Sequence, residues 1–187
     1  MSLDANHLLC VMDCDYLFGG ARANFSDAHR VEYPKLIDLI KKDRSPDLTY
    51  HFHAFIAMKD KPTGFGQAQF LSRLVQWGFD VHTGKLAYNS VTGDKERDNL
   101  SDMIIHFLKH FTCDHYGNTY PQTLVAVTGS FAFADIYEAL LYQGVTVEVF
   151  SYKEWEASPI SLRGNLPVIS RHVLLTDSIL YVPSSSA

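Results

Sequence analysis

The sequence has little cysteine, no long apolar run and no excess of positive charge, and each shortage excludes a class of protein. Its three cysteines, Cys10, Cys14 and Cys113, have neither CxxC spacing nor the even count of a disulfide framework, which suits a reducing compartment. No apolar stretch approaches the ~20 residues that a membrane span needs, and the short apolar start lacks the basic leader of a signal peptide. We therefore expect no membrane association and a cytoplasmic location.

The charge balance limits the partners of the chain. Lys and Arg number 16 against 21 Asp and Glu, a formal net charge of −5. This argues against tight nonspecific binding to nucleic acid, although a local basic patch is compatible with it. The hydrophobic share of 47% and the charged share of 20% are ordinary for a globular protein. Because the 187 residues contain no repeat, low-complexity block or linker, we expect a single domain over residues 1–187.

Short apolar runs alternate with segments of helical period, which predicts an α/β fold with a mainly parallel sheet. We expect strands over residues 7–13, 50–58, 79–89, 123–128, 145–151 and 173–182. We expect helices over residues 34–42, 66–78, 97–111 and 133–144, with their aromatic side chains mostly in the core. A surface loop is expected over 152–172, and the basic residues Lys41, Lys42 and Arg44 suit a helix end without needing a partner.

Polar side chains gather where the predicted strands end. Asp13 and Asp15 follow the first strand directly, and Thr128 and Ser130 follow the strand over 123–128. In an open α/β sheet, ligands bind at the carboxyl ends of the strands, where the strand order reverses. Asp98 and Asp102 open the central helix, and their spacing of four places both on one helical face.

Carboxylates from separate elements are the oxygen ligands expected for Mg²⁺ or Mn²⁺, which activate water for attack on a phosphoester. Plainer interpretations stand beside this one: Asp15 as a turn former, Asp98 as a helix N-cap and Asp102 as a solvated helix residue. His51 and His53 alternate on a strand without a carboxylate or cysteine at ligand spacing, so we expect no zinc site.

The stretch Asp13-Cys14-Asp15 is similar to the first motif of haloacid-dehalogenase-type phosphatases. Thr128 resembles that family's second motif, and residues 93–98 resemble its acidic metal motif. The acidic motif should follow the threonine strand, however, and here it precedes it; Leu17 also stands where that family has Thr or Val. This phosphatase is the lesser alternative.

From residue 8 to about 182, the chain resembles the NYN domain, a PIN-like nuclease group that includes the LabA-like proteins. VMDCDYLF resembles the opening strand with its Asp-rich end, and in GDKERDNLSDMIIHFL Lys95 and Asp98 stand at the family's Lys and Asp positions. VAVTGSFAFADIYEALLYQGVTVEVFS resembles the family's strand, turn, helix and following strand, with Thr128, Gly129 and Phe133 in place.

The resemblance implies a three-layer α/β/α, Rossmann-like fold of five or six strands, with the parallel sheet in the order 3-2-1-4-5. It implies a Mg²⁺- or Mn²⁺-dependent endoribonuclease with RNA as its partner, and it leaves a homodimer open. The residues implied as catalytic are Asp13 and Asp98, with Asp13, Asp98 and Asp102 as metal ligands. The residues implied as substrate-binding are Asp15, Tyr16, Lys95, Thr128 and Ser130.

Several family positions carry other residues. The family's Asp-Ser-Asp is replaced by Ser130-Phe131-Ala132, and Tyr16 and Ile104 stand where an Asn and a second helix acid are usual. Each missing carboxylate removes a charge and an oxygen ligand from a cation site. A catalytically degenerate NYN domain that binds RNA or a protein is therefore the main alternative to an active nuclease.

Overall fold

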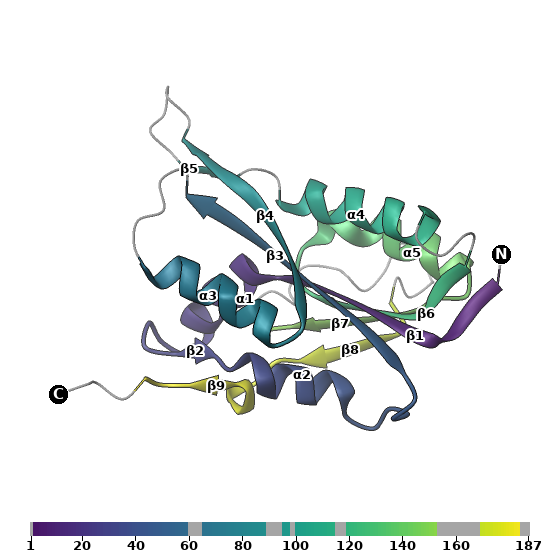
Figure 1. Ribbon diagram of the computed structural model, residues 1–187, viewed down its shortest axis with the longest axis horizontal. Helices are drawn as coiled ribbons and strands as arrows, with labels where there is room; N and C mark the ends of the chain where they lie inside the picture. Colours follow the sequence, from purple (N-terminus) through teal and green to yellow (C-terminus); the bar gives the residue numbers. More distant parts are fainter. Residues whose placement is uncertain are drawn as a thin grey trace.

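Six parallel strands form the centre of the molecule (Figure 1). The computed structural model describes residues 2–59, 65–88, 95–97, 100–114, 119–152 and 169–183. The parallel strands are β1 Ser2–Asp13, β3 Thr49–Lys59, β4 Phe79–Tyr88, β6 Thr119–Val127, β7 Thr146–Ser151 and β8 Arg171–Leu174. The short strand β5 Lys95–Arg97 adds to the edge, antiparallel to β4.

The sheet order is β5-β4-β3-β1-β6-β7-β8. Numbered along the chain, the six parallel strands follow the order 3-2-1-4-5-6, so the expected order of the first five is confirmed and β8 extends it. The chain builds outward from β1 in one direction through β3 and β4, and in the other through β6, β7 and β8. The strand order therefore reverses between β1 and β6, the place where open α/β sheets bind their ligands.

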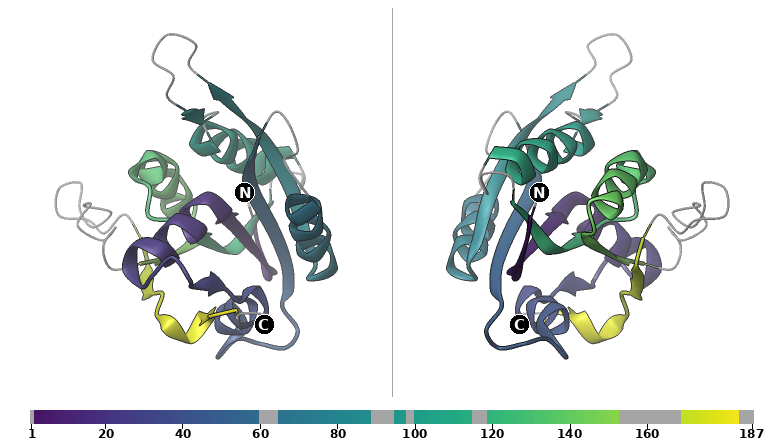
Figure 2. Two further views of the ribbon diagram at one scale, coloured as in Figure 1. Left: turned by 90° about the vertical axis from the view of Figure 1, so that its left-hand side faces the viewer. Right: turned by 90° about the vertical axis from the view of Figure 1, so that its right-hand side faces the viewer.

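Helices cover both faces of the sheet (Figures 1 and 2). One layer holds α1 Cys14–Asn24, α2 Tyr33–Lys41 and α3 Phe65–Gln76, and the other holds α4 Leu100–Asp114 and α5 Ala134–Tyr142. Strand β1 is buried on both faces, which explains why its sequence is one apolar run. Leu8, Cys10 and Met12 belong to the core beneath the first layer, whereas Leu9 and Val11 belong to the core beneath the second.

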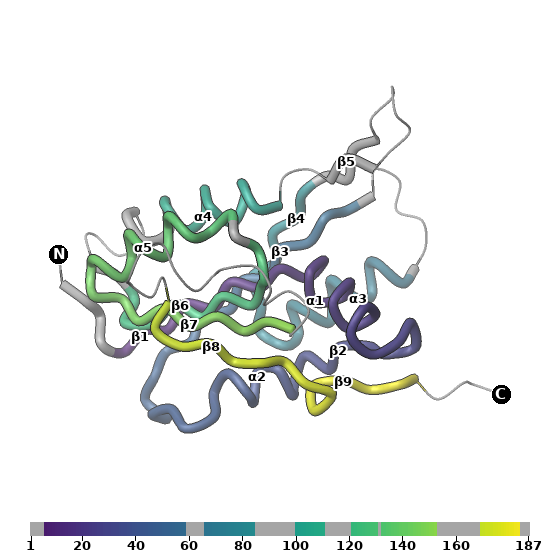
Figure 3. Tube along the Cα trace, turned by 180° about the vertical axis from the view of Figure 1, so that it is seen from behind, coloured from purple at the N-terminus to yellow at the C-terminus, as the bar shows by residue number. Residues whose placement is uncertain are grey.

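The sequence-based prediction missed one helix and misassigned the last strand. Helix α1 begins at Cys14, directly after Asp13. The single closing strand over 173–182 is instead β8, the 3-10 turn η3 Asp177–Ile179 and β9 Leu180–Tyr181. Thr176 caps the turn through its side chain, and β9 leaves the main sheet to pair with β2 Arg30–Val31. Figure 3 shows this last segment passing beside α2 on its way to β2.

An ion pair ties the α2 end to the sheet and corrects the expectation that Arg44 needs no partner. Arg44 Nη2 lies 2.7 Å from Glu148 Oε2, and both side chains are nearly buried. Glu148 is in β7, far from Arg44 in sequence, and Arg171 of β8 approaches the same oxygen at 3.7 Å.

Among the helices in the described part of the chain, none is both long and apolar enough to span a bilayer.

Candidate functional site at the carboxyl edge of the sheet

Asp13 lies at the centre of the carboxyl edge, as its position after the first strand predicts. It ends β1 and caps α1, because its Oδ1 accepts a hydrogen bond of 2.9 Å from the backbone N–H of Tyr16. In the sheet, Asp13 is the partner of Phe55 in β3, and the preceding Met12 pairs with Val127 in β6. The carboxylate is therefore oriented by the Tyr16 N–H, and the β1 backbone that carries it is paired with strands on both sides.

The turn after β6 lies next to Asp13. Thr128 is buried and Ser130 half-buried, and both hydroxyls hold the turn. Thr128 Oγ1 accepts from the N–H of Ser130, and Ser130 Oγ accepts from the N–H of Ala132, each at 3.3 Å. The chain then enters the 3-10 turn η1 Phe131–Phe133 and helix α5. Asp13, Thr128 and Ser130 are thus brought together as the sequence predicts.

The charge of Asp13 contributes to the raised pKa of one buried group in each helical layer. Burial, reinforced by Asp13, raises the pKa of the Tyr137 phenol of α5, so this phenol stays neutral. Burial likewise raises the pKa of the Cys14 thiol, with further contributions from Asp13 and Asp15. A thiol held protonated is a poor nucleophile, so Cys14 does not supply one to this site.

Asp15 and Tyr16, both predicted to bind substrate, have different surroundings. Asp15 is half-buried in the first turn of α1. Tyr16 is buried, and its hydroxyl accepts a hydrogen bond of 2.8 Å from the N–H of Tyr152, directly after β7. The Tyr152 hydroxyl in turn donates to the carbonyl of Leu17. These contacts give Tyr16 a packing role, holding α1 against the end of β7.

The remaining predicted residues come from the segment before and within α4. Asp102 is exposed in the first turn of α4. Lys95 belongs to β5, but its side chain lies outside the described residues, as does the whole of Asp98. Their predicted roles in catalysis, metal binding and substrate binding therefore stay predictions.

The described carboxylates do not by themselves make a site for a divalent cation. Within the part of the chain that the structure describes, no three His, Cys, Asp or Glu side chains come together as a potential metal centre. A Mg²⁺ or Mn²⁺ site needs several oxygen ligands around the ion. Asp13 is a suitable ligand, whereas the turn beside it offers hydroxyls in place of carboxylates.

A family model described as the NYN domain matches residues 9–167, most of the chain. The chain belongs to the NYN domain family. The domain is PIN-like and of the nuclease type, which fits the order of its parallel strands. Neither the curated proteins nor the solved structures gave a match. The family match removes the phosphatase alternative, which rested on the same Asp13-Cys14-Asp15 motif.

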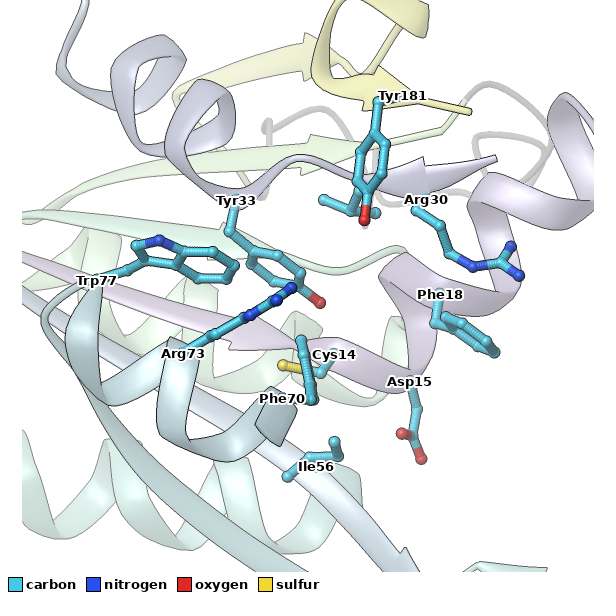
Figure 4. Close-up of a pocket in the computed structure, with 11 residues that line it drawn as sticks. Cys14, Asp15, Phe18, Arg30, Tyr33, Ile56, Phe70, Arg73, Trp77 and Tyr181 are labelled. Atoms are coloured by element: carbon cyan, nitrogen blue, oxygen red, sulfur yellow. The ribbon is translucent and has the colours of Figure 1, made fainter. Parts of the chain in front are cut away.

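A pocket of about 280 Å³ lies beside Asp15 in this NYN domain, and the sequence did not predict it (Figure 4). It lies between α1, α3 and the β2–β9 pair, and its wall includes Tyr33, Phe70 and Trp77. Phe70 and Trp77 are half-buried: they pack against the core, as expected of the aromatics on the helices, and they also line the pocket. The signal available in the sequence was Arg73, three residues after Phe70 and four before Trp77.

Proposed function

We propose that the protein is an RNA-binding NYN domain whose ligand lies across the carboxyl edge of the sheet, with a reduced acidic site. The turn after β6 is the observation that carries this proposal. Ser130 and Ala132 occupy the positions where the family resemblance places acids, and the turn is held by the hydroxyls of Thr128 and Ser130. The turn itself has no charged side chain.

A neutral hydroxyl turn suits a phosphate backbone. A hydroxyl that accepts one bond still has a proton to donate, and serine, threonine and backbone N–H groups are common partners of nucleic-acid phosphates. Ser130 is half-buried, so its side chain reaches the surface, whereas Thr128 is buried behind it.

The missing acids also change the electrostatics of binding. A pair of carboxylates repels phosphate unless a cation lies between them. With serine and alanine in their place, the turn itself contributes no carboxylate, and repulsion is smaller. We therefore expect RNA binding that does not require a divalent cation.

A metal-dependent endoribonuclease is the second candidate. Asp13 favours it, because the carboxylate is fixed at the point where the strand order reverses. Asp102, in the first turn of α4, is a further acid that the family resemblance implies as a metal ligand. In this case RNA hydrolysis would depend on Mn²⁺ or Mg²⁺ and on Asp13.

A fluorescent single-stranded RNA distinguishes the two candidates. Binding is measured by anisotropy in EDTA, and cleavage on denaturing gels in millimolar Mn²⁺, for wild type and Asp13→Asn. The proposal expects binding in EDTA and equal, background cleavage by both proteins. Cleavage by wild type that disappears in Asp13→Asn would establish the endoribonuclease instead. Absence of RNA binding under every condition would overturn both.

A further inference from the structure

The pocket between α1 and α3 has a wall of fixed aromatic rings. Tyr33 stacks on Trp77 with ring centroids 5.4 Å apart and planes 16° apart, and Phe70 lies 5.4 Å from Tyr33 at 54°. Tyr33 is buried, and its hydroxyl is hydrogen-bonded with the Cys14 side chain. Because these rings already hold one another, a planar ligand could stack on them without ordering loose side chains.

The same pocket carries two guanidinium groups. Arg30 Nη1 donates to the carbonyls of Asp27 and His29 at 2.6 and 2.9 Å, which positions the group and leaves it further N–H donors. Arg73 lies on α3 one turn from both Phe70 and Trp77, and Figure 4 shows it extending toward Tyr33. Guanidinium groups bind phosphate with paired N–H donors and also stack on planar rings.

Asp15 supplies the acidic group of the pocket. Among the lining residues in the described part of the chain it is the only acid, and it lies on the same side as Phe18 and Arg30 (Figure 4). The lining therefore has two positive charges and one negative charge, although the whole chain has a net charge of −5. A carboxylate beside a stacking wall is a suitable acceptor for ribose hydroxyls, as in dinucleotide-binding folds.

The size of the pocket limits its ligand. At about 280 Å³ it is just below the range of about 300–1,000 Å³ typical of small-molecule pockets, so it has room for one nucleotide rather than several. Asp15 is two residues from Asp13, so the pocket adjoins the carboxyl edge. A chain bound across that edge could place one of its nucleotides here.

We propose that this pocket binds one ribonucleotide: its base packs against the aromatic wall of Tyr33, Phe70 and Trp77, its phosphate pairs with Arg30 and Arg73, and a ribose hydroxyl donates to Asp15. The inference rests on the proposed function in taking RNA as the ligand class. The nucleotide has two conceivable sources, a free mononucleotide or one unit of an RNA chain, and the experiment separates them.

The test uses 5′-AMP in calorimetric titrations and a fluorescent single-stranded RNA in anisotropy titrations, both in EDTA. The variants are Arg73→Gln, in the pocket, and Arg171→Gln, which makes the same charge change at an exposed position of β8. We expect Arg73→Gln to weaken binding of at least one probe roughly tenfold or more, since the phosphate loses one of its two guanidinium partners. Arg171→Gln should bind as wild type does.

Asp15→Asn gives a second readout, the preference for AMP over 2′-deoxy-AMP, or for RNA over DNA of the same sequence. We expect this preference to fall toward one. Loss of RNA binding alone in Arg73→Gln identifies a unit of the chain as the ligand, and loss of AMP binding alone identifies a free nucleotide.

Equal affinities of Arg73→Gln and Arg171→Gln for both probes would overturn the pocket assignment. If wild type still binds RNA in that case, the proposed function stands without the pocket. If AMP binds through Arg73 and RNA does not bind at all, the pocket stands and the proposed function fails.

Discussion

Asp13 caps a helix with the same side chain that the second candidate function would use as a metal ligand. Its Oδ1 caps α1 while its position ends β1. Asparagine caps a helix about as well as aspartate, whereas alanine loses the hydrogen bond. We expect Asp13→Ala to lower the free energy of unfolding by about 1 kcal/mol and Asp13→Asn to leave it nearly unchanged. Urea denaturation measures both. Equal losses in the two variants would show that the charge, not the cap, stabilises this position.

Arg44 and Glu148 form an ion pair that the sequence did not predict. Because both are nearly buried, removing one partner leaves the other charge uncompensated. We expect Arg44→Met to lower the free energy of unfolding by about 3 kcal/mol. Arg171 is 60% exposed at the same carboxylate, so Arg171→Gln should cost less than about 1 kcal/mol. Similar losses in the two variants would contradict this assignment.

His82 makes stability depend on pH. Burial lowers its pKa from the ordinary 6.5, opposed by the charge of Asp80, and the ring stacks on Phe55 and hydrogen-bonds with His53. A histidine with a lowered folded-state pKa takes up its proton more readily when unfolded, so its contribution is complete above pH 6.5 and is lost as the pH falls below it.

We therefore expect the free energy of unfolding of wild type to fall between about pH 7 and pH 5 more steeply than that of His82→Gln. Denaturant titrations of both proteins across this range measure the difference. Parallel curves would mean that His82 titrates alike in the folded and unfolded states.

At the scale of elements, α1 is docked on the sheet through a close approach at Gly20. A Cβ at this position would meet ring carbons of Tyr152 at 2.2 and 2.6 Å, whereas a Cβ at Gly19 would meet nothing within 4 Å. Both glycines lie in α1, so they form a matched pair.

We expect Gly20→Ala to lower the free energy of unfolding by about 1–3 kcal/mol through overpacking. Gly19→Ala should raise it by about 0.5–1 kcal/mol, because alanine favours a helix over glycine. Thermal or urea unfolding of the two variants checks the signs. A stable Gly20→Ala protein would mean that Tyr152 moves aside at little cost.

Periodicity was enough to predict most elements, because buried parallel strands and amphipathic helices have clear patterns. It failed where the local sequence pattern fits both a strand and a turn. The segment 173–182 is rich in strand-forming residues, yet the Thr176 side chain caps a 3-10 turn within it. Strand β9 leaves the main sheet because it pairs with the two residues of β2. The paired residues are about 150 positions apart in the sequence, so no local pattern reveals this contact.

At the scale of the whole molecule, the strand order defines the edge at which Asp13, Thr128 and Ser130 meet. These residues could be predicted, because strand ends in a parallel sheet share one edge. The adjoining pocket could not, since Arg30, Tyr33 and Arg73 come from β2, α2 and α3 and meet only after folding. Edge and pocket together are the surface on which the proposed RNA binding rests.

The most direct test of RNA binding at this edge is one anisotropy titration of single-stranded RNA in EDTA, comparing wild type with Ser130→Asp. Aspartate can still accept the hydrogen bond from the N–H of Ala132, so the turn should persist while gaining a negative charge. We predict saturable binding by wild type and an affinity about tenfold lower for Ser130→Asp, because the new carboxylate repels phosphate. Equal affinities, or no binding by wild type, would contradict the account.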